Sequence, residues 1–254
     1  MELEYYHYII AIVGSALAGA INTLAGNGSA ITLTILTELL GLPGNIANGT
    51  NRVGVLSQTV ASTYAFHRKG KLHIFESRYY IILTIIGAMF GVYVATRISN
   101  EAFIQVFRYL MIVMLVVVLV KPKRWLRETD TDNPPSMWFI VPMFLALGFY
   151  GGFIQMGMGI FFLAIMVLGA RHSLMDSNVI KSLIVAVYTA IVLVIFHYKG
   201  LVDWKIGAIM AVGQMIGGYV MANVAAKHPK ANVWAHRVLV VVVIVAILRL
   251  FDVF

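Results

Sequence analysis

Cysteine is absent from the 254 residues of this chain, which excludes disulfides, thiolate metal ligands and a cysteine nucleophile. Charge is also scarce, because Asp, Glu, Lys and Arg make up only 12% of the residues, against about 25% in soluble domains. His, Asp and Glu do not recur at the spacing of metal ligands, and no nucleophile stands beside a base in an apolar segment. The sequence therefore predicts no cofactor, no metal and no enzymatic activity.

Apolar residues dominate instead, at 60% of the chain, compared with about 45–50% in soluble domains. The net charge of +8 arises from Lys and Arg in short loops between apolar runs. This pattern is typical of membrane orientation and argues against nucleic-acid binding. The acidic start, Met1–Glu4, is unlike a cleavable signal, so the first apolar run is expected to be a membrane helix. We predict a multi-pass protein whose partner is the lipid bilayer.

Charged residues, glycine and proline divide the chain into ten apolar segments, near residues 7–25, 29–42, 46–66, 73–96, 101–120, 137–156, 159–170, 176–196, 203–225 and 233–254. A helix needs about 20 residues to cross a bilayer core of about 30 Å. Segments 29–42 and 159–170 are too short for this, so we predict that they are re-entrant or span half of the membrane. The predicted fold is an all-α polytopic membrane protein with about eight full spans in a single transmembrane domain, residues 1–254.

A hydrophilic linker at residues 121–136 separates two halves of five segments each, residues 1–120 and 137–254. Phe66–Gly70 and Phe196–Gly200 share four of five residues at an offset of 130, and the same offset aligns Asn48 with Asn178. Because five is an odd number, the second half would enter the membrane from the opposite side. The excess of Lys and Arg in the linker places it in the cytoplasm. We therefore predict two inverted repeats.

The short segment of each half follows a Gly-x-Gly sequence, Gly26-Asn27-Gly28 and Gly157-Met158-Gly159. A broken helix is tolerated in a bilayer only where protein or a wet cavity covers it. The start of the next helix offers unpaired N–H groups and a partial positive charge, which suit an anion. The candidate ligands for a small anionic substrate are Asn22, Gly26, Asn27, Gly28, Ser29, Asn48, Thr50, Asn51, Arg52, Gly157, Gly159, Asn178 and Lys181.

Arg52 and Lys181 carry full positive charges within apolar segments. Arg52 could bind an oxyanion through the fork of its guanidinium. Lys181 aligns with Asn51 at the offset of 130 and would be a second cation. Simpler roles stay open for both, because Arg52 could snorkel to an interface or pair with Glu38, and Lys181 could pair with Asp176.

Packing would explain several other candidates. Gly26 and Gly28 are small enough to allow close helix contact, and Asn22 and Gln155 could hydrogen-bond between helices. A further set of small residues could pack within one protomer or between two, which leaves a homodimer open: Gly213, Gly217, Gly218 and Ala222.

The first-half motifs resemble those of a known family. Asn22–Thr32, Gly41–Pro43, Ala47–Arg52 and Phe66–Gly70 are similar to the signature of the TauE/SafE sulfite exporter family, also called the toluene sulfonate uptake permease family. The resemblance covers nearly the whole chain, with a more degenerate second half, and Asn27 stands where members of this branch usually have glycine. It implies a carrier for sulfite, sulfonates or other small organic anions in a bacterial inner membrane.

These features predict a secondary transporter that exports small anions by alternating access to a midplane site at the broken helices. An anion channel would have the same polar lining, so it stays as an alternative. An uptake permease of the same family is the other alternative, because the motifs carry no sign of direction.

Overall fold

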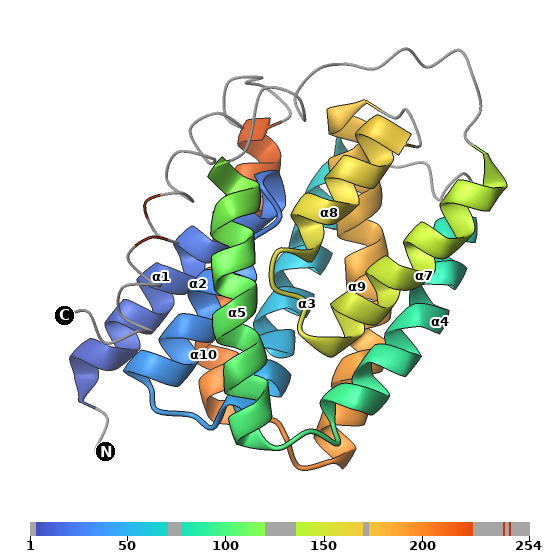
Figure 1. Cartoon of the computed structure of the whole chain (residues 1–254). Coiled ribbons are helices and arrows are strands. Elements are labelled where there is room, and N and C mark those ends of the chain that lie inside the picture. The colour runs from blue at the N-terminus through green and yellow to red at the C-terminus, as the bar shows by residue number, and fades with distance from the viewer. Residues whose placement is uncertain are drawn as a thin grey trace.

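The computed structural model describes residues 4–70, 78–119, 136–169 and 173–225, together with Val241 and Ile244. The described residues form helices and contain no strand. The helices are α1 (Tyr5–Leu24), α2 (Gly28–Thr34), α3 (Gly44–Arg68), α4 (Arg78–Ala95), α5 (Asn100–Leu119), α7 (Met137–Phe153), α8 (Met158–Ala164), α9 (Leu174–Tyr198) and α10 (Trp204–Ala225). Two π-helical turns, η1 (Ile35–Leu39) and η3 (Ile165–Gly169), continue α2 and α8. Figure 1 shows how the helices are arranged.

Nine of the ten predicted apolar segments are confirmed as helical, with α2–η1 and α8–η3 as the two short ones. The tenth segment, 233–254, and the linker, 121–136, fall outside the described residues, apart from single positions. Five described helices are long and apolar enough to cross a membrane, namely α1, α4, α5, α9 and α10. The structure is therefore that of a multi-pass membrane protein.

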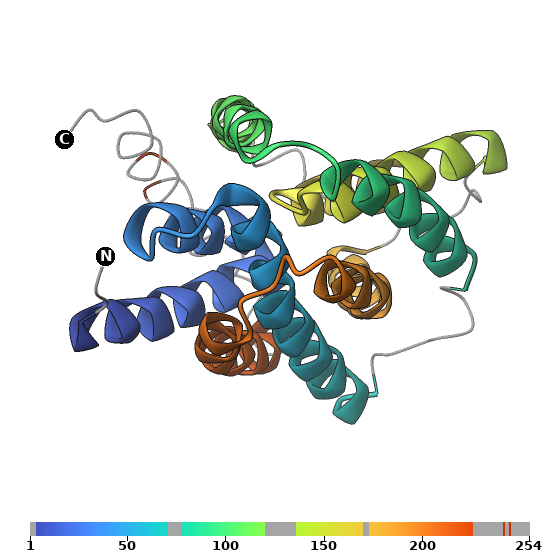
Figure 2. The same ribbon diagram turned by 90° about the horizontal axis from the view of Figure 1, so that it is seen from below.

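Helix α3 is long enough to span, at 25 residues, but it is unusually polar. Asn48, Asn51, Arg52 and Gln58 are all buried in it. These side chains are sheltered because α3 runs through the middle of the bundle, between α9 and α10 (Figure 2). A helix that is polar inside a bilayer requires such cover, so α3 is the natural wall of a solute site.

Helix boundaries recur at an offset of 130 residues. Helix α2 begins at Gly28 and α8 at Met158, and both pass into a π-helical turn after seven residues. Helix α3 spans Gly44–Arg68 and α9 spans Leu174–Tyr198, each with 25 residues. Each half thus contains the same sequence of elements: a first helix, a break, a short helix and a helix of 25 residues.

The two basic loops, one with Lys69 after α3 and one with Lys199 after α9, lie near opposite ends of α3. At one end, the Lys69 ammonium donates to the carbonyl of Asn223 in α10, at 3.2 Å. At the other end, the loop that follows Lys199 contacts α3, and the backbone N–H of Asp203 donates to the Thr50 hydroxyl at 2.9 Å. Thr50 and Lys69 are about 28 Å apart along the helix, at about 1.5 Å per residue.

The small residues of α10 are used inside the protomer. A Cβ atom on Gly213 or Gly217 would overlap the backbone of α1 at Ile12 or Ala16. A Cβ on Gly218 would overlap the Gln58 side chain of α3. This face therefore brings α10 close to α1 and α3.

Candidate functional site

The two helix breaks cross in the middle of the bundle. Ala25–Asn27 separates α1 from α2, and Ile154–Gly157 separates α7 from α8. The backbone N–H of Gly159 donates to the carbonyl of Gly26 at 3.1 Å. A Cβ atom on either glycine would overlap the backbone of the other, and Gly26 also has a φ of +78°. Both positions therefore require glycine, and the crossing fixes the two halves against each other.

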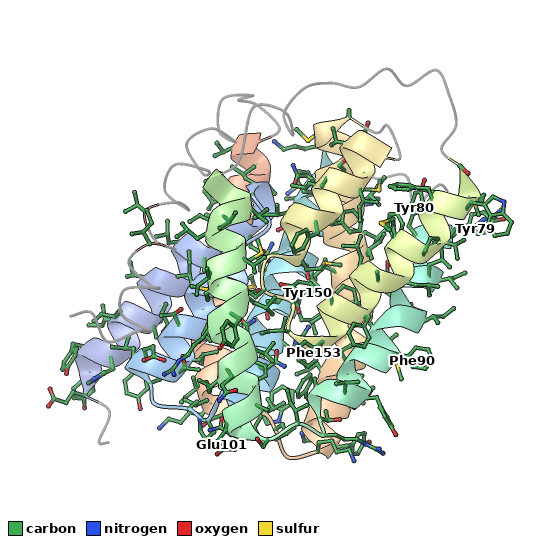
Figure 3. All side chains as sticks on the ribbon, in the orientation of Figure 1. Tyr79, Tyr80, Phe90, Glu101, Tyr150 and Phe153 are labelled. Carbon is green, nitrogen blue, oxygen red and sulfur yellow. The ribbon has the colours of Figure 1, made fainter. Side chains whose placement is uncertain are left out.

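Tyr150 shapes the second break from the side of α7. Its hydroxyl donates to the carbonyl of Met156 at 2.5 Å, inside the segment between α7 and α8. Figure 3 shows Tyr150 and Phe153 near the end of α7, where the chain turns into α8. The Asn48 amide nitrogen of α3 donates to the carbonyl of Phe153 at 2.8 Å. The end of α7 is thus tied both to its own loop and to α3.

A small cavity lies beside the crossing, between α1, α3, α8 and α9. Its volume is about 10 Å³, which is room for about one water molecule. Its lining residues are Asn22, Gln58, Thr59, Gln155, Met158, Gly159, Lys181, Ser182 and Val185. Three of these, Asn22, Gly159 and Lys181, belong to the predicted site.

Lys181 places a buried cation in the cavity wall, with only 4% of its surface exposed. Its ammonium donates to the carbonyls of Asn22 and Thr23 at 3.1 and 3.0 Å and to Asn178 Oδ1 at 2.7 Å. The alternative of an ion pair with Asp176 is wrong, because the three N–H groups of the ammonium donate to other acceptors and Asp176 is exposed at the start of α9. Among the described residues no carboxylate balances the charge of Lys181.

Arg52 contacts the end of α7, as Lys181 contacts the end of α1. Its exposed fraction is 0%, so the snorkelling alternative is wrong. Glu38 is exposed and makes no ion pair with it, so that alternative is wrong as well. The two terminal nitrogens of Arg52 donate to four acceptors: Gly151 O at 2.6 Å, Gly152 O at 3.1 Å, Asn48 Oδ1 at 3.3 Å and Gln155 Oε1.

Both cations thus bind the carbonyl end of a broken helix, Lys181 that of α1 and Arg52 that of α7. The last carbonyls of a helix lack intrahelical partners and carry partial negative charge. Each cation carries a full positive charge, which exceeds the partial negative charge of the carbonyls that it contacts. A positive potential therefore remains around the crossing. Only Nε of the Arg52 guanidinium is buried without a partner among the described residues.

The predicted residues at the start of α2 form a second polar group near the crossing. The backbone N–H of Gly28 donates to Asn22 Oδ1 at 3.3 Å, and Asn51 Oδ1 accepts from the Thr32 hydroxyl at 2.6 Å. Three buried groups near the start of α2 have no partner among the described residues: the Asn27 amide, the Ser29 hydroxyl and the Asn51 amide nitrogen. Such groups cost about 1–3 kcal/mol each when left unpaired. They are expected where water or a ligand binds.

The remaining predicted residues serve the scaffold around the cavity. Thr50 binds the loop before α10, and Asn178 holds the Lys181 ammonium. Gly157 caps α8 with a φ of +68°, which glycine adopts without strain. Asn48 links Arg52 to α7. None of these four lines the cavity.

Sequence reasoning left out several lining residues: Gln58, Thr59, Gln155 and Ser182. The offset of 130 gave a usable signal for one of them, because Ser182 aligns with Arg52. Gln155 stands directly before the Met156-Gly157 turn, where a polar side chain at a helix break was a second signal.

Substitution of Arg52 by Lys is expected to destabilise the fold by about 2–3 kcal/mol. A point charge cannot replace two nitrogens that serve four acceptors, and unpaired buried acceptors carry a cost of this size. Thermal unfolding of the purified variant measures the effect. An unfolding temperature equal to that of the wild type would show that the four contacts contribute nothing.

A bundle of apolar helices, with two broken helices that meet beside buried cations, is the architecture of a multi-pass membrane protein with a polar interior, as found in secondary transporters. The model of the family "Sulfite exporter TauE/SafE" matches residues 11–250. The chain belongs to this family of multi-pass membrane transporters.

Similar proteins come from several bacteria. "Probable membrane transporter protein ORF9" of Sinorhizobium sp is 25% identical over 224 residues, 88% of this chain and 85% of that protein. "Probable membrane transporter protein YfcA" of Escherichia coli K12 is 27% identical over 204 residues, 79% of this chain and 74% of that protein. A "Probable membrane transporter protein" of Xylella fastidiosa is 24% identical over 242 residues, 93% of this chain and 92% of that protein.

Proposed function

We propose that the protein exports small oxyanions, sulfite or a sulfonate, across a bacterial inner membrane. The observation that carries this proposal is Lys181, a buried ammonium that lines the cavity without a carboxylate partner among the described residues. A buried charge is costly unless it is balanced. A bound anion would supply the balance, whereas a cationic substrate would be repelled.

The size of the cavity supports a carrier more than a channel. At about 10 Å³ it is too small for an anion of several heavy atoms such as sulfite. Substrate would therefore enter only when the walls separate, as at a carrier site that opens to each side in turn. A channel needs a continuous wet path.

We further propose that the two halves are inverted repeats and exchange conformations during transport. The recurrence of helix boundaries at an offset of 130 and the placement of the two basic loops near opposite ends of α3 support this arrangement. The linker and the Lys69 loop would then face the cytoplasm.

Cysteine labelling tests the inversion directly. The chain contains no cysteine, so only the introduced residue can react. In sealed vesicles of known orientation, Lys69→Cys is expected to react with an impermeant maleimide only from the cytoplasmic side. Lys199→Cys is expected to react only from the outside. Labelling of both positions from the same side would show that the halves are not inverted.

A binding screen tests the anionic substrate. Purified protein is heated with sulfite, thiosulfate, methanesulfonate or acetate as sodium salts, with sodium chloride at matched ionic strength as the control. A ligand at about 100 times its Kd stabilises by about 2.7 kcal/mol, so sulfite is expected to raise the unfolding temperature in a saturable way. No shift with any of these anions would argue against the proposal.

A further inference from the structure

Gln155 has a backbone conformation that its side chain disfavours. Its φ is +64°, and it is the only residue other than glycine with a positive φ in the described part of the chain. The other left-handed positions are glycines, including Gly26 and Gly157 in the two breaks. Strain of this kind clusters at functional sites, where the surrounding structure holds it in place. The side chain of Gln155 lines the cavity.

Arg52 fixes the orientation of the Gln155 amide. A guanidinium has donors and no acceptor, so the atom that faces it must be the amide oxygen. The amide nitrogen is thereby turned away from Arg52. It donates to no other group in the described ranges. The nitrogen is also not fully enclosed by other atoms, and the cavity that Gln155 lines is the space open to it.

We propose that the Gln155 amide N–H group is the specificity-determining donor that binds an oxygen of the transported anion, and that Arg52 is the residue that positions it. This inference rests on the proposed transport of anions. Lys181 would supply the charge in the same cavity and Gln155 the directed hydrogen bond. The site would thus prefer an anion with an oxygen acceptor over an anion that lacks one.

Two substitutions separate this role from a purely structural one. Gln155→Glu keeps an acceptor for Arg52, and even strengthens that contact, but removes the donor. Gln155→Met removes both donor and acceptor without adding charge. Because Glu also places a negative charge beside the anion, the Glu variant tests the contact with Arg52 through stability, and the Met variant tests the donor through affinity. If the charge of Lys181 alone bound the anion, the Met variant would keep the wild-type affinity.

The experiment is titration of purified protein with sodium sulfite by isothermal calorimetry, with thermal unfolding of each variant. Both variants are expected to bind sulfite more weakly, by roughly ten-fold for Met and a hundred-fold or more for Glu. Gln155→Glu is expected to unfold at or above the wild-type temperature. Gln155→Gly, which removes the backbone strain, is expected to stay folded and to lose affinity as the Met variant does.

Gln214 of α10 provides the matched control. It is also a buried glutamine whose amide nitrogen has no partner among the described residues, but it does not line the cavity. Gln214→Met is expected to keep the wild-type affinity within about three-fold.

Each outcome decides the question. Wild-type affinity in either Gln155→Glu or Gln155→Met, with the wild-type protein binding sulfite, would overturn the role of Gln155 and leave anion transport standing. An equal loss in Gln214→Met would overturn it too, because the effect would not be specific to the cavity. Absence of sulfite binding to the wild-type protein would remove the proposed function, and this inference with it.

Discussion

Replacement of Lys181 by Met is expected to weaken sulfite binding by roughly ten- to a hundred-fold and to abolish transport at low sulfite concentration. The three N–H groups of the Lys181 ammonium already donate to protein acceptors, so it would act on the anion through its charge, and an interaction of about 1.5–3 kcal/mol corresponds to a change of this size. Met has nearly the same length but no charge, so the cavity keeps its shape and loses its positive potential. Calorimetric titration with sulfite measures the affinity.

The fold is expected to survive this substitution. Removing a buried charge that has no carboxylate partner among the described residues relieves a desolvation cost. That gain offsets the loss of hydrogen bonds to the end of α1. Lys199→Met is the matched control, since Lys199 is exposed at the end of α9 and should leave affinity unchanged. Full sulfite affinity in Lys181→Met would remove this residue from the site.

Replacement of Gly159 by Ala is expected to lower the unfolding temperature by about 2–12 °C. The new methyl group would overlap the backbone of Gly26, which cannot rotate away as a side chain would. Overpacking of this kind typically costs about 1–3 kcal/mol. Each kcal/mol corresponds to about 2–4 °C in a chain of this size. Without the overlap the substitution would raise the unfolding temperature, because alanine favours a helix over glycine by about 1 kcal/mol.

Gly200→Ala is the control for this prediction. Gly200 has a φ of +68° and nothing within 4 Å of a Cβ atom, so only the backbone penalty applies. That penalty is about 1–2 kcal/mol. If Gly159→Ala were as stable as the wild type, the two halves would not be held together by the crossing of their breaks.

The helices and their breaks could be predicted because both depend on local chemistry. Apolar length defines a span, and the described helices begin and end within a few residues of the predicted segments. The breaks were visible because the left-handed conformations at Gly26 and Gly157 favour glycine. The offset of 130 was visible in the sequence and recurs in the boundaries of α3 and α9.

The partners of the polar residues could not be predicted, because they depend on contacts between distant parts of the chain. Arg52 binds Gly151, and Lys181 binds Thr23, which are 99 and 158 positions away. Sequence patterns suggested nearby acids as the alternatives, Glu38 and Asp176, and both were wrong. Gln155 was missed as a ligand because only the fold shows that Arg52 turns its amide toward a cavity.

The central claim is that a small anion binds between two broken helices and crosses the membrane as the site opens to each side in turn. Counterflow of radiolabelled sulfite in proteoliposomes of purified protein measures this most directly. The account predicts uptake that saturates with external sulfite and is accelerated by unlabelled sulfite inside, with both properties lost in Lys181→Met. Flux that rises linearly with concentration and ignores internal sulfite would contradict it.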